Sequence, residues 1–181
     1  MIAEEAWRIL HSADLICSAQ QVSEAVDRVA AAVTARLGER QPLVLSVMGG
    51  AVIFTGNLLL RLRFPLDFDY VHVTRYDNAT AGGEIQWIAA PRGVVRDRVV
   101  LLVDDILDEG ITLAAIKDRM MSDGAAECYA AVLADKDIGK QKPITADFVG
   151  VKLPNRYVFG FGMDVRGAWR NLPAIYALRE A

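Results

Sequence analysis

The chain has 181 residues, of which 53% are hydrophobic and 24% are charged, and its formal net charge at pH 7 is -3. So apolar a composition excludes an intrinsically disordered chain, and the acidic balance argues against binding nucleic acid through a broad basic surface. The length fits one domain that buries its own core, and no apolar run approaches the roughly 20 residues of a membrane-spanning helix.

In the first half of the chain, helix and strand patterns alternate. Valines recur at spacings of three and four residues from Val22 to Val33, which predicts a helix that Gly38 ends. Ser18 and Gln21 fit a capping box at its start. The later patterns predict, in order, a buried strand at 43–47, a break at 48–50, a helix at 52–62, a strand at 69–76, a mobile loop at 77–84 and a strand at 85–90.

The second half contains the most apolar short strand, Val99–Val103. A helix at about 112–122 follows it, and Leu113, Ile116 and Met120 have the spacing of an inward face. Further strands are expected at 128–133, 148–153 and 157–161. Strands that alternate with helices in this way predict an α/β fold, with a parallel twisted sheet flanked by helices.

The chemistry is concentrated directly after the strand at 99–103. Ligands of open α/β sheets bind where strands end, and a helix N-terminus after a Gly-bearing loop favours a phosphate. The loop 108–112, with Gly110 and the Thr112 hydroxyl, has this form. Carboxylates repel phosphate, so Asp104 and Asp105 fit a diol or Mg²⁺ instead. A structural alternative stays open, in which Asp104 and Asp105 cap the helix or lie in solvent. A P-loop ATPase is excluded, because the chain has no Gly-x4-Gly-Lys-Ser/Thr motif.

Two stretches of the sequence resemble a known protein family. The stretch 103–112 resembles the 5-phosphoribosyl 1-pyrophosphate (PRPP) motif of type I phosphoribosyltransferases. The stretch 146–164, with Arg170 six residues after Asp164, resembles the purine-binding hood of the hypoxanthine-guanine branch. The resemblance runs from about 43 to 176. It implies the type I fold as a single domain over 1–181, with a core at about 40–136 and a small hood from about 1–20 and 137–181.

The resemblance also implies an activity. Members of the family transfer 5-phosphoribosyl from PRPP to N9 of hypoxanthine or guanine, giving IMP or GMP and pyrophosphate, with Mg²⁺ as cofactor. Asp108 corresponds to the catalytic base near purine N7. The residues that would bind the ribose and the 5'-phosphate are Asp104, Asp105, Asp108, Glu109, Gly110, Ile111 and Thr112. The metal contacts would come from Asp104, Asp105 and Asp164.

The remaining site residues are implied in the same way. Pyrophosphate would contact Met48, Gly49, Gly50 and Arg170, with a cis peptide expected between Met48 and Gly49. Lys136 would donate a hydrogen bond to purine O6, Tyr157 would stack on the purine ring, and Val158 and Asp164 would contact the edge of the base. Arg75 and Tyr76 would begin a flexible loop that closes over the site. The chain departs from the common family residues at Met48, Arg75, Glu109 and Ile111.

Two other functions remain as alternatives: a regulator of this fold that binds nucleotide or RNA, and a phosphoribosyltransferase for xanthine or another base. The leading interpretation implies PRPP and a 6-oxopurine as partners, neither nucleic acid nor membrane, and a homodimer or homotetramer. Cys17 and Cys128 are too far apart to indicate a disulfide framework or zinc site. With an acidic N-terminus unlike a signal peptide, they favour a cytoplasmic location.

Overall fold

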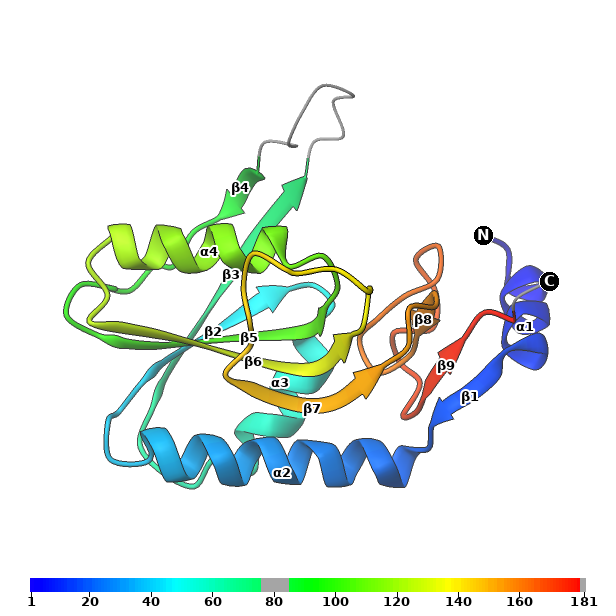
Figure 1. Ribbon diagram of the computed structural model, residues 1–181, viewed down its shortest axis with the longest axis horizontal. Helices are drawn as coiled ribbons and strands as arrows, with labels where there is room; N and C mark the ends of the chain where they lie inside the picture. The colour runs from blue at the N-terminus through cyan, green and yellow to red at the C-terminus, as the bar shows by residue number, and fades with distance from the viewer. Residues whose placement is uncertain (76–84, 180–181) are drawn as a thin grey trace.

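The computed structural model describes residues 1–75 and 85–179, which form two sheets of different size (Figure 1). The larger sheet has the strand order β4-β3-β2-β5-β6-β7, and only β4 runs antiparallel to its neighbour. Its strands are β2 (Leu43–Met48), β3 (Asp67–Arg75), β4 (Ile85–Ala89), β5 (Val99–Leu107), β6 (Glu127–Lys136) and β7 (Phe148–Leu153).

Helices cover both faces of this sheet. In Figure 1, α2 (Ala19–Leu37) and α3 (Val52–Leu59) lie on one side and α4 (Ile111–Ser122) on the other. Alternate residues of β5 enter opposite cores: Leu101 and Val103 join the core under α2 and α3, and Val100 and Leu102 join the core under α4. A strand buried on both faces needs the continuous apolar run that the sequence has there. The predicted α/β fold is therefore confirmed.

Most of the predicted elements are present, with shifted ends. The capping box of α2 is observed, with the Gln21 amide donating to the Ser18 hydroxyl, and the helix is capped at Gly38. The prediction of a helix to Leu62 was wrong, because α3 ends at Leu59 and the next residues form a tighter turn, in which the Arg61 amide donates to the Leu58 carbonyl. Leu62 is still buried, which explains why the apolar pattern continued.

The two central strands are longer than their apolar runs. The strand predicted at 99–103 continues to Leu107, so Asp104 and Asp105 lie on β5 rather than after it. Likewise β6 continues past Leu133 to Lys136. The cause is the ladder between them, which extends to the pair Leu107 and Asp135. Backbone pairing needs no apolar side chain, so the sequence pattern could not report these ends.

The smaller sheet, which we call the hood sheet, has the order β1-β9-β8. It joins β1 (Asp14–Cys17) and β9 (Ile175–Ala177), from opposite ends of the chain, with β8 (Val158–Phe159), and α1 (Ala3–Ser12) lies beside it. The sequence patterns predicted neither α1 nor β1 nor β9. The strand expected at 157–161 is shorter than predicted, because only the two residues of β8 are paired with β9. The β7 strand belongs to the larger sheet, although its residues fall in the range expected for the hood. Within the described residues, no helix is long and apolar enough to cross a membrane.

Candidate active site

Strand register brings the predicted site residues to one edge of the larger sheet. In the β2–β5 ladder Ser46 pairs with Val103, so the loop after β2 lies level with the acidic pair of β5. In the β5–β6 ladder Leu107 pairs with Asp135, so Asp108 and Lys136 follow side by side. Met48 and Lys136, which are 88 positions apart in the chain, are thereby brought to the place where parallel strands end and where such sheets bind ligands.

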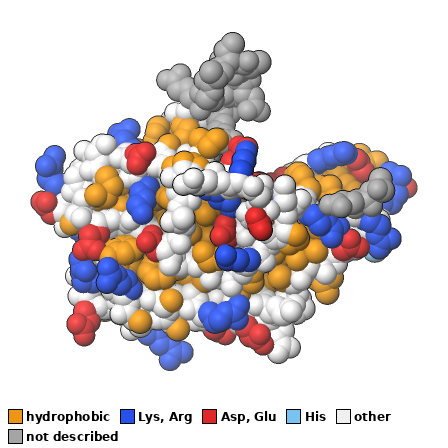
Figure 2. Space-filling view, viewed as in Figure 1, with side chains coloured by type: hydrophobic (Ala, Val, Ile, Leu, Met, Phe, Trp, Pro, Cys, Tyr) orange, Lys and Arg blue, Asp and Glu red, His pale blue; other side chains and the backbone are white. Residues whose placement is uncertain are grey.

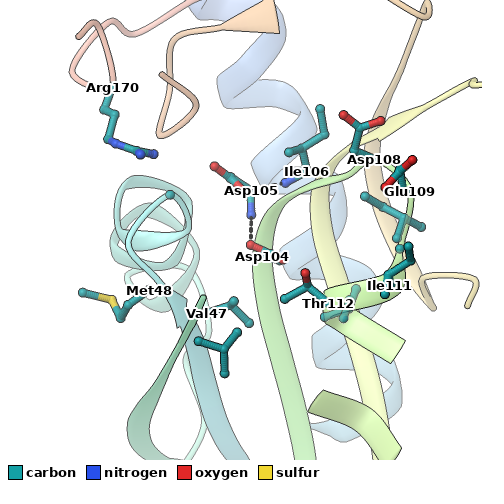
Figure 3. A pocket seen from close by; sticks show the side chains of 15 residues that line it. Val47, Met48, Asp104, Asp105, Ile106, Asp108, Glu109, Ile111, Thr112 and Arg170 are labelled. Atoms are coloured by element: carbon teal, nitrogen blue, oxygen red, sulfur yellow. Dashed lines mark hydrogen bonds between the residues drawn. The ribbon is translucent and has the colours of Figure 1, made fainter. Parts of the chain in front are cut away.

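A cavity of about 420 Å³ lies at this edge, shown in Figure 3. We call it the acidic cavity. It contains ten of the predicted site residues: Met48, Gly50, Asp104, Asp105, Asp108, Glu109, Gly110, Ile111, Thr112 and Arg170. Loop, strand and helix N-terminus therefore surround one space, which excludes the alternative that these acids lie apart in solvent.

The acidic pair is held tightly within β5. The Asp105 amide donates to Asp104 Oδ1 at 2.9 Å, and the Ile106 amide donates to Asp105 Oδ1 at 2.9 Å. Burial raises the pKa of Asp104 well above its usual value, and the neighbouring Asp105 charge adds to this. Burial also raises the pKa of Asp105, although the hydrogen bond with Asp104 and the charge of Arg170 limit the rise. Two carboxylates in this setting favour a cation or hydroxyl donors.

The loop before α4 has the form expected of a phosphate cradle. Gly110 has φ of 80°, a left-handed conformation that favours glycine, and α4 begins at the next residue. Ile111 and Thr112, in the first turn of α4, line the cavity. Glu109, which would be unfavourable beside a phosphate, has its carboxylate 3.6 Å from Lys140 Nζ.

A second, smaller cavity of about 220 Å³ adjoins the first. We call it the hood cavity. It shares Asp105, Ile106, Asp108 and Arg170 with the acidic cavity. Its other walls come from the end of β6 and from the hood: Lys136, Tyr157, Val158, Met163 and Asp164. All four residues predicted to bind the purine thus lie around one space.

Two contacts define the walls of the hood cavity. Lys136 Nζ donates to Asp108 Oδ2 at 2.6 Å, and only 11% of the lysine side chain is exposed. The Tyr157 hydroxyl donates to the Asp164 carbonyl at 3.2 Å, while 53% of Tyr157 is exposed. An exposed ring and a buried cationic donor that line one cavity offer a stacking face and a hydrogen bond to a flat polar molecule.

The hood loop is fitted closely against the larger sheet. A Cβ on Gly162, whose φ is 106°, would lie 2.2 Å from the Gly50 carbonyl oxygen. A Cβ on Gly50 would lie 1.9 Å from Asp105 Oδ2. Arg170 Nη1 donates to the Gly162 carbonyl at 2.6 Å, and Nη2 lies 2.5 Å from Asp164 Oδ1. Glycine at 50 and 162 therefore lets three separate segments approach one another around Arg170.

The α1 helix supports the same loop, a role that the sequence did not reveal. The rings of Trp7 and Trp169 meet edge to face at 4.9 Å, and Trp169 Nε1 donates to the Ala6 carbonyl at 2.9 Å. Arg166 Nη1 donates to Glu5 Oε1 at 2.7 Å. The amphipathic pattern of α1 was the available signal, but α1 has no fully buried residue that would have marked it as part of the fold.

The remaining predicted residues are placed as follows. The peptide between Met48 and Gly49 is cis, which confirms that expectation. Gly49 does not line either cavity. Arg75 ends β3, next to the residues whose structure is not described. Tyr76 and the loop expected at 77–84 lie outside the described residues.

Comparison with known proteins agrees with this arrangement. The model of the phosphoribosyl transferase domain family matches residues 12–166. The chain belongs to this family. It is 31% identical to a hypoxanthine-guanine phosphoribosyltransferase of Bacillus subtilis, over 92% of this chain and 93% of that protein. The family resemblance inferred from 103–112 and 146–164 is confirmed.

Two further matches extend the comparison. The bifunctional protein TilS/HprT of Listeria innocua is 34% identical over 91% of this chain, which spans only 26% of that longer protein. Among solved structures, a hypoxanthine phosphoribosyltransferase from Trypanosoma cruzi, described as a ternary substrates complex, superposes with a TM-score of 0.85 at 27% identity. That match covers 93% of this chain and 97% of the other.

Proposed function

We propose that this protein is a purine salvage enzyme that transfers 5-phosphoribosyl from PRPP to N9 of hypoxanthine or guanine. The observation that carries the proposal is the pair of adjoining cavities. One combines acids with a helix N-terminus, as a sugar phosphate needs, and the other combines a buried lysine with an exposed aromatic ring, as a 6-oxopurine needs. They share Asp105 and Asp108, so two bound substrates would meet there.

Asp108 is the proposed catalytic base. In the reaction, purine N9 bonds to C1' of the ribose, the C1'–O bond breaks, and its electron pair leaves with pyrophosphate. The proton on purine N7 passes to the Asp108 carboxylate. Asp108 lines both cavities, and Lys136 holds it by a 2.6 Å hydrogen bond. The neighbouring carboxylates of β5 stabilise the positive charge that develops on the ribose.

Lys136 is the proposed selector of the base. Its ammonium has only donors, so it pairs with the O6 acceptor of hypoxanthine, guanine or xanthine and mismatches the amino group of adenine. Tyr157 supplies the stacking face, and Val158 and Asp164 border the same cavity.

The proposed cofactor is Mg²⁺, and the residues present fit it. Asp104, Asp105 and Asp164 provide the hard oxygen atoms that Mg²⁺ prefers. No group of three or more acidic, histidine or cysteine side chains within the described residues could hold an ion alone. The ion would therefore bind with substrate oxygens and water. Bound there, Mg²⁺ would supply positive charge that offsets the negative charge of the pyrophosphate leaving group.

The pyrophosphate group is assigned to the remaining corner of the acidic cavity. Arg170 borders both cavities, and an arginine fork suits phosphate oxygens. Met48 and Gly50 line the same cavity, and the absence of a side chain on Gly50 allows backbone N–H groups to approach an anion. The absence of a basic side chain at position 48 gives Arg170 and the metal a larger share of this binding.

We further propose a homodimer or homotetramer in the cytoplasm. Phe68 and Tyr70 of β3 and Ile88 of β4 are exposed by 51%, 38% and 55%. They lie on β3 and on β4, the edge strand of the sheet, and exposed apolar side chains that gather on one surface are commonly covered by a second subunit. Sedimentation of the wild type and of Phe68→Asp tests this, with the variant expected at lower mass. Both cysteines are buried free thiols, which suits a reducing compartment.

The test of the activity is product formation. Protein incubated with PRPP, Mg²⁺ and hypoxanthine should yield IMP and pyrophosphate in equal amounts, and a chelator should stop the reaction. If folded protein that binds PRPP gives no nucleotide with any purine, the proposal fails. Salt-sensitive retention of RNA would then favour a regulator. On the face in Figure 2, acidic and basic side chains are interspersed rather than gathered into one basic surface.

A further inference from the structure

Lys142 lines neither of the two cavities but bonds to Leu107, which lines the acidic cavity, and to Lys136, which lines the hood cavity. It lies in the connection between β6 and β7, and only 11% of its side chain is exposed. Its Nζ donates to the Leu107 carbonyl at 2.6 Å, to Asp135 Oδ1 at 2.7 Å and to the Lys136 carbonyl at 2.6 Å. An ammonium has three hydrogens to donate, so these contacts use its whole capacity. Lys142 is thereby committed to the protein and not to a ligand.

The three acceptors define what Lys142 does. Leu107 is the last residue of β5 and directly precedes Asp108, while Asp135 and Lys136 end β6. Leu107 and Asp135 are the last pair of the β5–β6 ladder. One buried cation therefore ties the two strand ends together just beyond their last rung. Charge-assisted hydrogen bonds of this kind are the strong ones in proteins.

A second observation links Lys142 to the same loop. A Cβ on Gly110 would lie 3.6 Å from Lys142 Cβ, so the lysine stem lies close to the loop that carries Asp108. The stem thus lies beside the loop, while the ammonium bonds Leu107, the residue that directly precedes Asp108. A methionine in its place would keep most of the stem packing and remove only the ammonium.

We infer that Lys142 is a positioning residue, which holds the ends of β5 and β6 so that Asp108 and Lys136 stand at hydrogen-bond distance beside the base. This inference rests on the proposed function, because it assigns Lys142 an effect on hypoxanthine through those two residues. It explains why a lysine is buried at a place where no substrate group needs it. Without the ammonium, two carbonyls and a carboxylate would lose their partner.

The test compares Lys142→Met with the wild type by steady-state kinetics with hypoxanthine at saturating PRPP and Mg²⁺. We expect the KM for hypoxanthine to rise about tenfold and kcat to fall about tenfold, with the KM for PRPP changed less than about threefold. Lys152→Met is the matched control, because Lys152 is exposed and, together with Lys142, lines a third cavity at the connection between β6 and β7. It should behave as the wild type. Should Lys142→Met fail to fold, Lys142→Gln, which keeps two donors, is measured in its place.

A double-mutant cycle separates positioning from general destabilisation. In a Lys136→Ala background, Lys142→Met should raise the KM for hypoxanthine by less than about twofold, since the residue it positions is gone. The same tenfold rise in both backgrounds, or no rise in either, would overturn the inference. A wild type without turnover would instead refute the proposed function, so the two failures can be told apart.

Discussion

The two adjoining cavities are built by opposite means. The acidic cavity lies at the ends of parallel strands: β2 pairs with β5 as far as Val103, and β6 pairs with β5 at Asp104 and at Ile106, on both sides of Asp105. The hood cavity is closed by a loop rather than a sheet. In the segment that holds Asp164 and Arg170, left-handed φ angles occur at Gly160, Phe161, Gly162, Arg166, Gly167 and Trp169.

This difference predicts two kinds of sensitivity. Residues at the strand ends are held by the core of the larger sheet, so their substitution should change chemistry while the fold survives. The hood loop depends on individual contacts, such as the ion pair of Arg170 with Asp164 and the edge-to-face contact of Trp7 with Trp169. Loss of one such contact should alter substrate affinity and local stability before it alters the rate of the chemical step.

The largest effect is expected at Asp108. Asp108→Asn removes the proposed base but keeps the shape of the side chain, so kcat should fall about 100-fold or more, within the usual contribution of general base catalysis. The KM for PRPP should change less than about threefold. Asp118→Asn, at an exposed position of α4, is the control. Unchanged turnover of Asp108→Asn in steady-state assays would remove Asp108 from the mechanism.

Lys136 comes next. Lys136→Ala removes a charged donor whose hydrogen bond contributes about 1.5–3 kcal/mol, so the KM for hypoxanthine should rise about tenfold or more. PRPP binding, measured by calorimetry, should be retained. Lys152→Ala provides the matched exposed control. Equal losses of hypoxanthine and PRPP affinity would contradict the separation of the two cavities.

A smaller effect is expected where the hood meets the larger sheet. Gly162→Ala places a Cβ against the Gly50 carbonyl at a left-handed φ, which should lower the free energy of unfolding by about 1–3 kcal/mol. The same shift should raise the KM for PRPP several-fold, because Gly162 accepts from Arg170. Gly56→Ala, in α3, is the control, since its Cβ would meet nothing within 4 Å. Equal unfolding free energies for the two variants would show that the junction is loose.

The smallest effect concerns acid sensitivity of the hood sheet. Hydrogen bonding from Arg156 holds the pKa of Asp14 in β1 below its ordinary value of 3.8. A carboxylate with a lowered pKa stabilises the fold above that ordinary value and stops doing so as the pH falls through the lowered pKa. The difference in thermal unfolding midpoint between the wild type and Asp14→Asn should therefore be constant near neutrality and shrink below about pH 4. A difference that does not shrink as the pH falls below about 4 would mean that Asp14 acts through packing.

Much of the fold could be predicted from local patterns. The strand at 148–153 and the capped helix beginning at Ser18 were visible because apolar periodicity and capping chemistry act over a few residues. The short elements α1, β1 and β9 were not visible. They owe their structure to partners at the other end of the chain, as in the pairing of Asp14 with Ala177.

The sequence predicted which residues belong to the candidate site, but it did not predict which of their side chains are in contact. The motif around 103–112 indicated a sugar phosphate, and the family resemblance supplied the purine side. The hydrogen bond of Lys136 to Asp108, across 28 positions, follows from the β5–β6 register, which no local pattern encodes. A lysine in a loop between strands is usually a solvated surface residue, so the burial of Lys142 could be learned only from the structure.

The most direct test of the account is a steady-state comparison of four bases with PRPP and Mg²⁺. If the buried donor Lys136 selects a 6-oxo group, kcat/KM for hypoxanthine, guanine or xanthine should exceed that for adenine by at least about 1,000-fold. A site that leaves a polar group unpaired when the wrong substrate binds can discriminate by as much as about 10⁴–10⁵. Comparable turnover of adenine, or no turnover of any oxopurine by folded protein that binds PRPP, would contradict it.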